Sequence, residues 1–188
     1  SLPLVLILSC FTGFIAGLSM TAISGGIANN YMGTAVSRAV FSEMGPTFTG
    51  LILAARIGSK ISGELGSMRI SEQIDAMKCL CLDPLSYLVA PRIIATFAMG
   101  PVIYIISSAV AIVGAQFIAT LTMGIDPYVF YNSMRLMFHE GIVIMGLVKS
   151  LAFGGLIGIS GCYFGYHTTG GAIGVGNAIR GAVVTSSL

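Results

Sequence analysis

The sequence between Ile93 and Ile125 reads IIATFAMGPVIYIISSAVAIVGAQFIATLTMGI and contains no charged side chain. A helix of about 20 apolar residues crosses a bilayer, so this run is long enough for one membrane span. Residues 1–37 carry no charge, and residues 150–179 carry none apart from the ionisable His167. One such run is compatible with a buried helix of a soluble protein. Three in 188 residues predict an all-α protein that crosses a membrane several times.

The overall composition agrees with a lipid environment. Mean hydropathy is +0.94 and only 9% of the residues are charged, whereas soluble domains carry about a quarter. The net charge of +2 is too small to indicate a nucleic-acid partner. Cys79 and Cys81 form C-x-C, which is neither a redox C-x-x-C nor half of a zinc pattern. We therefore interpret the cysteines as packing residues and expect no metal site.

Glycine, proline and charge divide the chain into about five predicted transmembrane helices. Gly13 and Gly17 form G-x-x-x-G in the first helix, a pattern that allows close helix contact. We expect a chain break at Gly25-Gly26 and Asn29-Asn30, and a flexible turn at Gly170–Gly176. The predicted helices are 3–24, 34–62 with a kink at Gly45-Pro46, Pro91 to about 121 with a bend at Gly100-Pro101, 141–165, and a fifth from near Ala178.

A polar island at about residues 65–82 interrupts these apolar runs. Ten of the 16 Asp, Glu, Lys and Arg residues lie between Glu43 and Arg92. The island is too short and too charged to span a membrane, so we predict a surface helix with Ser71 or Ser67 as N-cap and Asp83-Pro84 at its end. Its mixed charge suits a protein groove better than anionic lipid. The alternative is a helix that lies on the membrane surface without a protein partner. The apolar positions are Leu65, Met68, Ile70, Ile74, Met77 and Leu80, and the polar ones are Arg69, Glu72, Gln73, Asp75 and Lys78.

The basic residues predict an orientation. Arg56, Lys60, Arg69, Lys78 and Arg92 surround the island, whereas Arg135 stands alone in the 122–140 connection. The positive-inside rule places the island in the cytoplasm and 122–140 outside. In that connection Asp126-Pro127 predicts the start of a short helix.

Four ionisable residues in apolar surroundings are candidates for a polar cavity. Arg56, Lys60 and Glu64 are spaced i, i+4, i+8 on one helix face, and Lys149 lies inside an otherwise uncharged helix. Such groups usually face a cavity or one another. Snorkelling to the headgroups is the alternative for Arg56 and Lys60. For Lys149 the alternative is pairing with Glu140 or with a buried acid.

Catalytic motifs are missing from the sequence. It has no G-x-S-x-G, no H-E-x-x-H and no P-loop, and its glycine-rich run 170–176 lacks the Gly-Lys-Ser/Thr that grips phosphate. We predict that the chain is not an enzyme. A membrane-embedded lipid-modifying enzyme using Glu64 or His167, and a structural membrane scaffold, are the two alternatives.

Several of these residues together resemble the MlaE (YrbE) permease family, the membrane subunits of ABC transporters associated with MCE proteins. The resemblance runs from about Leu4 to the end of the chain and is densest from Gly45 to Arg92. It rests on Gly45-Pro46, Ala55-Arg56-x-Gly58-Ser59, Glu64-x-Gly66-x-Met68-Arg69-x-Ser71-Glu72-Gln73-Ile74-Asp75-Ala76-Met77, Asp83-Pro84, Pro91-Arg92, Gly124-x-Asp126, Lys149-Ser150 and Ser186-Ser187-Leu188.

The resemblance implies a homodimeric inner-membrane permease, or one of the plastid inner envelope, that moves phospholipid or another hydrophobic lipid. It implies an ABC ATPase partner, which binds ATP and Mg²⁺ in place of this chain, and an MCE-domain lipid-binding partner. The island becomes the coupling helix that contacts the ATPase through Met68, Arg69, Glu72, Gln73, Asp75 and Met77. We expect residues 1–188 to form one transmembrane permease domain that is truncated at both ends.

Overall fold

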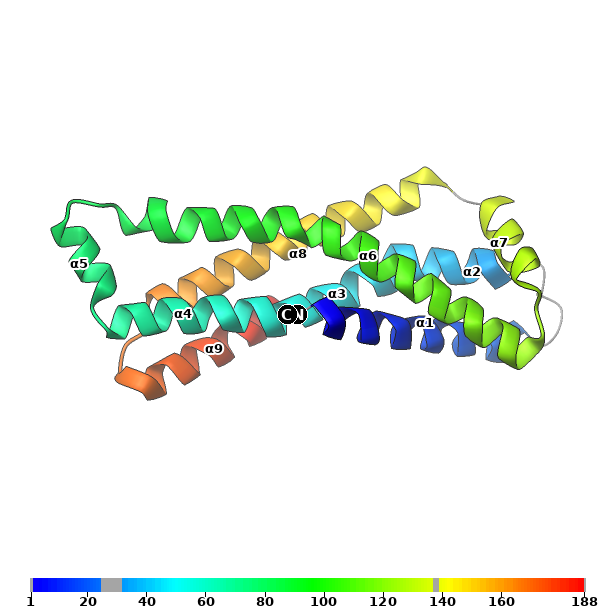
Figure 1. Cartoon of the computed structure of the whole chain (residues 1–188), viewed down its shortest axis with the longest axis horizontal. Coiled ribbons are helices and arrows are strands. Elements are labelled where there is room, and N and C mark those ends of the chain that lie inside the picture. Colours follow the sequence, from blue (N-terminus) through cyan, green and yellow to red (C-terminus); the bar gives the residue numbers. More distant parts are fainter. Residues whose placement is uncertain (1, 25–31, 137–138, 188) are drawn as a thin grey trace. The chain divides into compact units, whose positions relative to one another are not determined.

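The computed structural model describes residues 2–24, 32–136 and 139–187 (Figure 1). These ranges are helical and contain no strand. The predicted break at Gly25-Gly26 and Asn29-Asn30 lies outside them. The helices are α1 (Leu2–Ser24), α2 (Met32–Ala39), α3 (Gly45–Leu53), α4 (Ser59–Ile70), α5 (Gln73–Cys79), α6 (Ala90–Met123), α7 (Pro127–Leu136), α8 (Glu140–Tyr166) and α9 (Gly171–Ser187), with π-helical turns at Val40–Met44, Ala54–Gly58 and Leu85–Val89.

The helices form two compact units. Unit 1 comprises Ser1–Thr49 and Val102–Ser150, and unit 2 comprises Gly50–Pro101 and Leu151–Leu188. Within the described residues, two helices are long and apolar enough to cross a membrane, Leu85–Thr122 and Glu140–Tyr166, and Val5–Ser19 is a shorter apolar helix. The all-α prediction is confirmed for the described residues, whereas the count of five spans stays a prediction.

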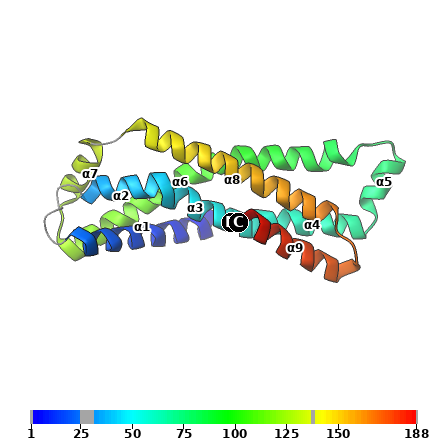
Figure 2. The same cartoon turned by 180° about the vertical axis from the view of Figure 1, so that it is seen from behind.

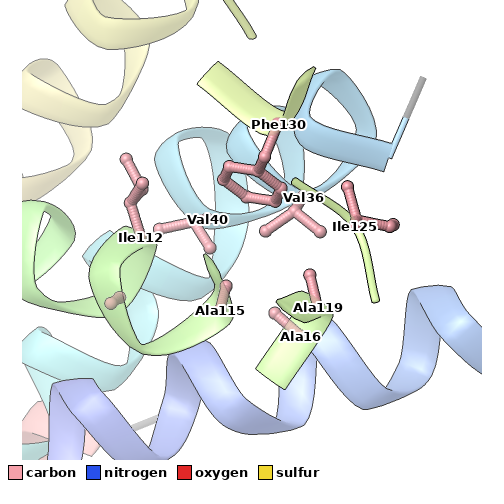
Figure 3. Close-up of a cluster of buried hydrophobic side chains, with 9 residues drawn as sticks. Ala16, Val36, Val40, Ile112, Ala115, Ala119, Ile125 and Phe130 are labelled. Carbon is pink, nitrogen blue, oxygen red and sulfur yellow. The ribbon is translucent and has the colours of Figure 1, made fainter. Parts of the chain in front are cut away.

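The core of unit 1 gathers small and branched side chains from α1, α2, α6 and α7. Phe130 of α7 lies over Val36 of α2, and Ala115 and Ala119 of α6 lie close to Ala16 of α1 (Figure 3). All five residues are at most 1% exposed. The Thr34 hydroxyl also donates to the Ser133 carbonyl at 2.6 Å, which joins α2 to α7. Because these core side chains are closely packed and buried, they fix how α1, α2, α6 and α7 lie against one another.

The predicted G-x-x-x-G contact is confirmed and lies between α1 and α6. A Cβ atom built on Gly13 would overlap the backbone carbonyl of Ala111, and one on Gly17 would lie 3.3 Å from the Ala115 carbonyl oxygen. From the other side, a Cβ on Gly114 would lie 2.7 Å from the Cys10 carbonyl oxygen. Glycine on both helices lets the two backbones touch, as expected for small residues at membrane helix interfaces.

Of the prolines inside the described helices, Pro46 and Pro91 each lie just after a π-helical turn. The Gly45 N–H bonds to the Val40 carbonyl before Pro46, and the Ala90 N–H bonds to the Leu85 carbonyl before Pro91. Proline lacks an N–H and its ring clashes with the carbonyl four residues earlier. The wider turn moves that carbonyl away and lets the helix continue. The departure from α geometry, at Val40–Met44, lies just before Gly45-Pro46, and the kink at that pair stays a prediction.

The prediction that Pro91 opens the long helix is wrong, because the helix begins at Pro84. Asp83 caps it: the Leu85 N–H donates to the Asp83 carboxylate at 3.2 Å and the Ser86 hydroxyl at 2.7 Å. These bonds, with that of Ser86 the stronger, hold the pKa of Asp83 below its usual value. Asp83-Pro84 is therefore a helix start. Asp126-Pro127 is another, as predicted, with the Tyr128 N–H at 3.1 Å from the Asp126 carboxylate.

The flexible turn predicted at Gly170–Gly176 is also wrong, because α9 begins at Gly171 rather than near Ala178. The turn is shorter than predicted and uses Gly170 and Gly171, the first residue of α9, whose φ angles are +90° and +70°. In unit 2, α9 packs along α4 (Figure 2). A Cβ on Gly66 of α4 would lie 3.5 Å from the Val175 side chain. Packing against α4 outweighs the low helix propensity of glycine.

Candidate functional site

The polar island folds as two helices rather than one. Its first part, through Ile70, completes α4, and α5 follows after a turn at Ser71 and Glu72 (Figure 1). The predicted N-cap role of Ser67 or Ser71 is wrong. Ser71 ends α4, where its hydroxyl donates to the Ser67 carbonyl at 2.8 Å. A hydroxyl bonded back to the preceding turn cannot cap the helix that follows.

Glu72 makes the turn between the two helices. Its φ of +58° is left-handed, a conformation that costs a non-glycine residue of order 1–3 kcal/mol. No side-chain bond caps α5, and Glu72 and Gln73 are both exposed. The carboxylate of Glu72 therefore stands at the surface, in a backbone position that glycine would fill with less strain.

The end of α5 is also specified locally. Cys81 has φ +56°, the Cys81 N–H bonds to the Lys78 carbonyl at 3.0 Å, and the Leu82 N–H bonds to the Met77 carbonyl at 3.1 Å. This pair of bonds is a Schellman motif, which ends a helix at a left-handed residue. Residues with a left-handed backbone conformation, Glu72 and Cys81, thus stand at both ends of α5 and set where the helix begins and ends.

Asp75 holds the island together. Its carboxylate accepts bonds from Arg69 at 2.8 Å and from Lys78 at 3.1 Å. The bond from Lys78, followed by that from Arg69, keeps the pKa of Asp75 below its usual value. Ile74 beside it is fully buried, while Met68 and Met77 are half-buried. Arg69 and Asp75, both predicted to contact an ATPase, therefore contact each other across the turn.

Two of the predicted cavity residues meet, and a third partner joins them. Lys60 and Glu64 lie 3.8 Å apart on α4, and Arg92 of α6 approaches the other oxygen of Glu64 at 3.4 Å. Lys60 is 76% exposed and Arg92 only 20%. Arg56 is exposed in the π-helical turn Ala54–Gly58, and no ion pair joins it to the described residues. The interhelical contact of Glu64 is thus with Arg92, which sequence spacing did not indicate.

Arg92 lies beside another unusual feature of unit 2. Its Nη1 atom is buried without a hydrogen-bond partner among the described residues, as is the hydroxyl of Ser62. Leu65, Ile61 and Cys162 form the hydrophobic cluster next to them. Arg92 is mostly buried beside an apolar cluster and has a carboxylate partner, so the Glu64–Arg92 ion pair connects α4 with α6.

Lys149 has an acidic partner that the sequence analysis did not name. Its Nζ donates to a Glu43 carboxylate oxygen at 2.7 Å and to the Ser42 carbonyl at 3.0 Å. Glu43 lies in the π-helical turn Val40–Met44, and the pair belongs to unit 1. The expected alternatives were Glu140 or a buried acid, and the structure gives Glu43, an exposed one.

Tyr104 fixes the backbone next to this pair. Its hydroxyl donates to the Phe41 carbonyl at 2.8 Å, and its ring is fully buried. A Cβ atom on Gly146 would overlap the Tyr104 hydroxyl. Glycine at 146 therefore leaves the space in which Tyr104 reaches the π-helical turn that carries Glu43.

Comparison with known proteins assigns the chain to a family. The family described as "Permease MlaE" matches residues 1–188. The chain belongs to the MlaE permease family. The predicted resemblance is confirmed over the whole sequence.

Two of three relatives of this MlaE-family permease are named as probable ABC transporter permeases. A probable ABC transporter permease protein of Rickettsia prowazekii is 36% identical over 189 residues, which are 100% of this chain and 73% of that protein. One of Synechocystis sp. is 40% identical over 86% of this chain and 61% of its own length. The chloroplastic protein TRIGALACTOSYLDIACYLGLYCEROL 1 of Arabidopsis thaliana is 32% identical over 84% of this chain and 45% of its own. The chain is accordingly a permease subunit of the ABC transporter type, and the names imply an ATPase partner.

Proposed function

We propose that this permease moves phospholipid or another hydrophobic lipid between the inner membrane and an MCE-type carrier, as a homodimer driven by a separate ATPase. The observation that carries the proposal is the α5 segment. It is a short, charged connection whose helix ends and ion pairs are fixed by its own residues. A connection with such a defined shape suits docking into a partner's groove, because little ordering entropy is lost on binding.

The tie between α4 and α6 supports a route for coupling. Residues on either side of α5 are joined by the Glu64–Arg92 contact at 3.4 Å. A force on α5 would reach α4 and α6 together, because the Glu64–Arg92 contact joins these two helices on either side of the α5 segment. ATP-driven closure of the partner would then move α4 and, with it, Arg56 and Lys60. We propose that Lys149 contacts the lipid headgroup and that Glu43 neutralises it when the site is empty.

Neither alternative function gains an observation in its favour. Glu64 is held between Lys60 and Arg92, and His167 Nδ1 lies 2.9 Å from the Tyr163 carbonyl. An enzyme would need one of these groups aimed at a substrate. Purification with a co-migrating ATPase distinguishes the transporter from both an enzyme and a scaffold.

Glu72 provides the test of the coupling role. Reversing both Glu72 and Asp75 would also break the ion pairs that hold α5, so a single change at Glu72 is sharper. We expect Glu72→Lys to weaken ATPase binding about 10- to 100-fold, the usual effect of losing one charge-assisted bond. Glu72→Gly removes the carboxylate and relieves the left-handed strain, so the permease should be slightly more stable and still bind the ATPase poorly.

Both variants are measured by ATPase affinity and by ATP-dependent lipid transfer in proteoliposomes, with thermal stability as the folding control. Normal ATPase affinity and normal transfer in both would remove Glu72 from the coupling surface. Loss in Glu72→Lys but not in Glu72→Gly would show that an added positive charge, rather than the missing carboxylate, disturbs the interface.

The predicted orientation is tested by cysteine labelling. Asn132 is exposed on α7, and Cys79 is exposed at the end of α5. Versions that keep a single cysteine, either Asn132→Cys or native Cys79, should behave oppositely with a membrane-impermeant thiol reagent. In cells without an outer-membrane barrier we expect position 132 to react before lysis and Cys79 only afterwards. The reverse order would mean that the island is extracytoplasmic.

A further inference from the structure

A cavity of about 480 Å³ opens in unit 1 between α2 and the start of α8. Its volume is within the range of small-molecule sites, ~300–1,000 Å³. None of the predicted cavity residues lines it. Its walls combine hydroxyl, charged and apolar side chains: Thr34, Ser37, Arg38, Phe41, His139, Glu140, Gly141, Ile142 and Met145.

Arg38 and Glu140 give this cavity one fixed charge of each sign. Neither forms an ion pair with the other, or with any other residue in the described part of the chain. Both are exposed at the cavity. A guanidinium grips phosphate oxygens in bidentate fashion, and a carboxylate accepts bonds from an ammonium group. A ligand that carries both a phosphate and a primary ammonium would satisfy the two residues together.

An apolar groove adjoins the cavity at Phe41, which lines both. The groove has a volume of about 330 Å³, and its walls are nearly all hydrocarbon. It runs past Ile105, Ile112 and Val143, with Tyr104 and Ser108 also in its wall. A cavity that carries two opposite charges, next to an apolar groove that shares Phe41 with it, matches an amphiphile, because the headgroup meets charged side chains and the acyl chain meets hydrocarbon.

We propose that this site, which is separate from the one at Lys149, binds one zwitterionic phospholipid of the phosphoethanolamine type. Its phosphate contacts Arg38, its ammonium contacts Glu140, and one acyl chain lies in the groove beyond Phe41. The inference deepens the proposed function by naming the headgroup class. It rests on that function for the role of the lipid in transport, but not for binding itself.

The test uses the full chain purified in detergent. Short-chain phosphatidylethanolamine and phosphatidylglycerol are titrated separately, and bound lipid is counted by native mass spectrometry. We expect the parent to prefer phosphatidylethanolamine. Arg38→Gln should lower the affinity for both lipids about tenfold or more, as for a lost charge-assisted bond. Glu140→Gln should lower the affinity for phosphatidylethanolamine alone and bring the ratio of the two affinities toward one.

Two control variants test whether the loss of binding comes from the cavity itself rather than from a general change in charge. Arg135→Gln removes an exposed cation of α7 that does not line the cavity, and it should bind both lipids as the parent does. Arg38→Lys keeps the charge but loses the bidentate geometry, so its affinity should lie between those of the parent and Arg38→Gln. Equal binding of the two lipids by the parent, or unchanged binding in both Arg38→Gln and Glu140→Gln, overturns the proposal.

Location is tested with a phosphatidylethanolamine that carries a diazirine in one acyl chain. Cross-links should fall within residues 104–113 and 141–145, and cross-links only elsewhere overturn the proposal. The outcome is separable from that of the proposed function. Cross-links at this site without ATP-dependent transfer would remove the transporter proposal alone, and transfer without cross-links here would remove this inference alone.

Discussion

Gly13→Ala is expected to destabilise the folded permease by about 3 kcal/mol, because one added methyl group meets a backbone atom rather than a movable side chain. The new Cβ would overlap the Ala111 carbonyl of α6. Overpacking costs ~1–3 kcal/mol when side chains can shift, and a rigid helix backbone places the cost at the upper end. For a chain of this size we expect a fall of about 6–12 °C in Tm.

The matched control is Gly176→Ala. Gly176 lies inside α9, and a Cβ there meets no atom within 4 Å. Alanine has the higher helix propensity by ~1 kcal/mol, so this variant should gain stability where Gly13→Ala loses it. Gly17→Ala, whose Cβ would lie 3.3 Å from the Ala115 carbonyl oxygen, should fall between the two. Thermal unfolding in detergent measures all three, and equal Tm values for Gly13→Ala and Gly176→Ala would contradict the α1–α6 contact.

Lys149→Met is expected to reduce lipid that co-purifies with the permease about tenfold or more, as for loss of a charge-assisted bond to a phosphate. The lysine lies 2.7 Å from Glu43, so a single substitution also leaves that carboxylate without its cation. The experiment therefore needs Glu43→Gln and the double variant beside Lys149→Met. Bound lipid, ATP-dependent transfer and Tm are measured for each.

The two roles of the pair predict different patterns across these variants. If Lys149 contacts the headgroup, the double variant stays poor in bound lipid, while Glu43→Gln holds more lipid and releases it more slowly. If the pair only joins the π-helical turn Val40–Met44 to α8, each single variant loses stability and the double variant recovers both stability and transport. Unchanged bound lipid and transfer in Lys149→Met would exclude Lys149 from the lipid site.

Sequence patterns predicted the features that depend on neighbouring residues. The uncharged runs became α1, α6 and α8, and Asp126-Pro127 became the start of α7. Gly13 and Gly17 became a close helix contact. These signals are local, because each acts through residues that are close in sequence and does not depend on where the rest of the chain packs. They are a run of apolar side chains, a carboxylate before a proline, and two glycines one turn apart.

The errors arose where a local rule has two outcomes. Asp83-Pro84 was interpreted as a helix end, but the same pair caps the next helix, because the chain reverses at Cys81 instead. The glycines of 171–176 were assigned to a turn, but packing against α4 makes them helical. Pro91 was assigned to a helix start because the preceding π-helical turn, which removes the proline clash, has no sequence signature.

By itself, the sequence determined that the chain is helical, that its charge is concentrated in one short connection, and that it resembles one permease family. Tertiary structure alone decided which charges meet. Lys149 and Glu43 are 106 residues apart along the chain, and Glu64 contacts Arg92 on another helix. An ion pair requires two side chains within about 4 Å, and only the packing of helices far apart in the sequence brings such residues to that distance.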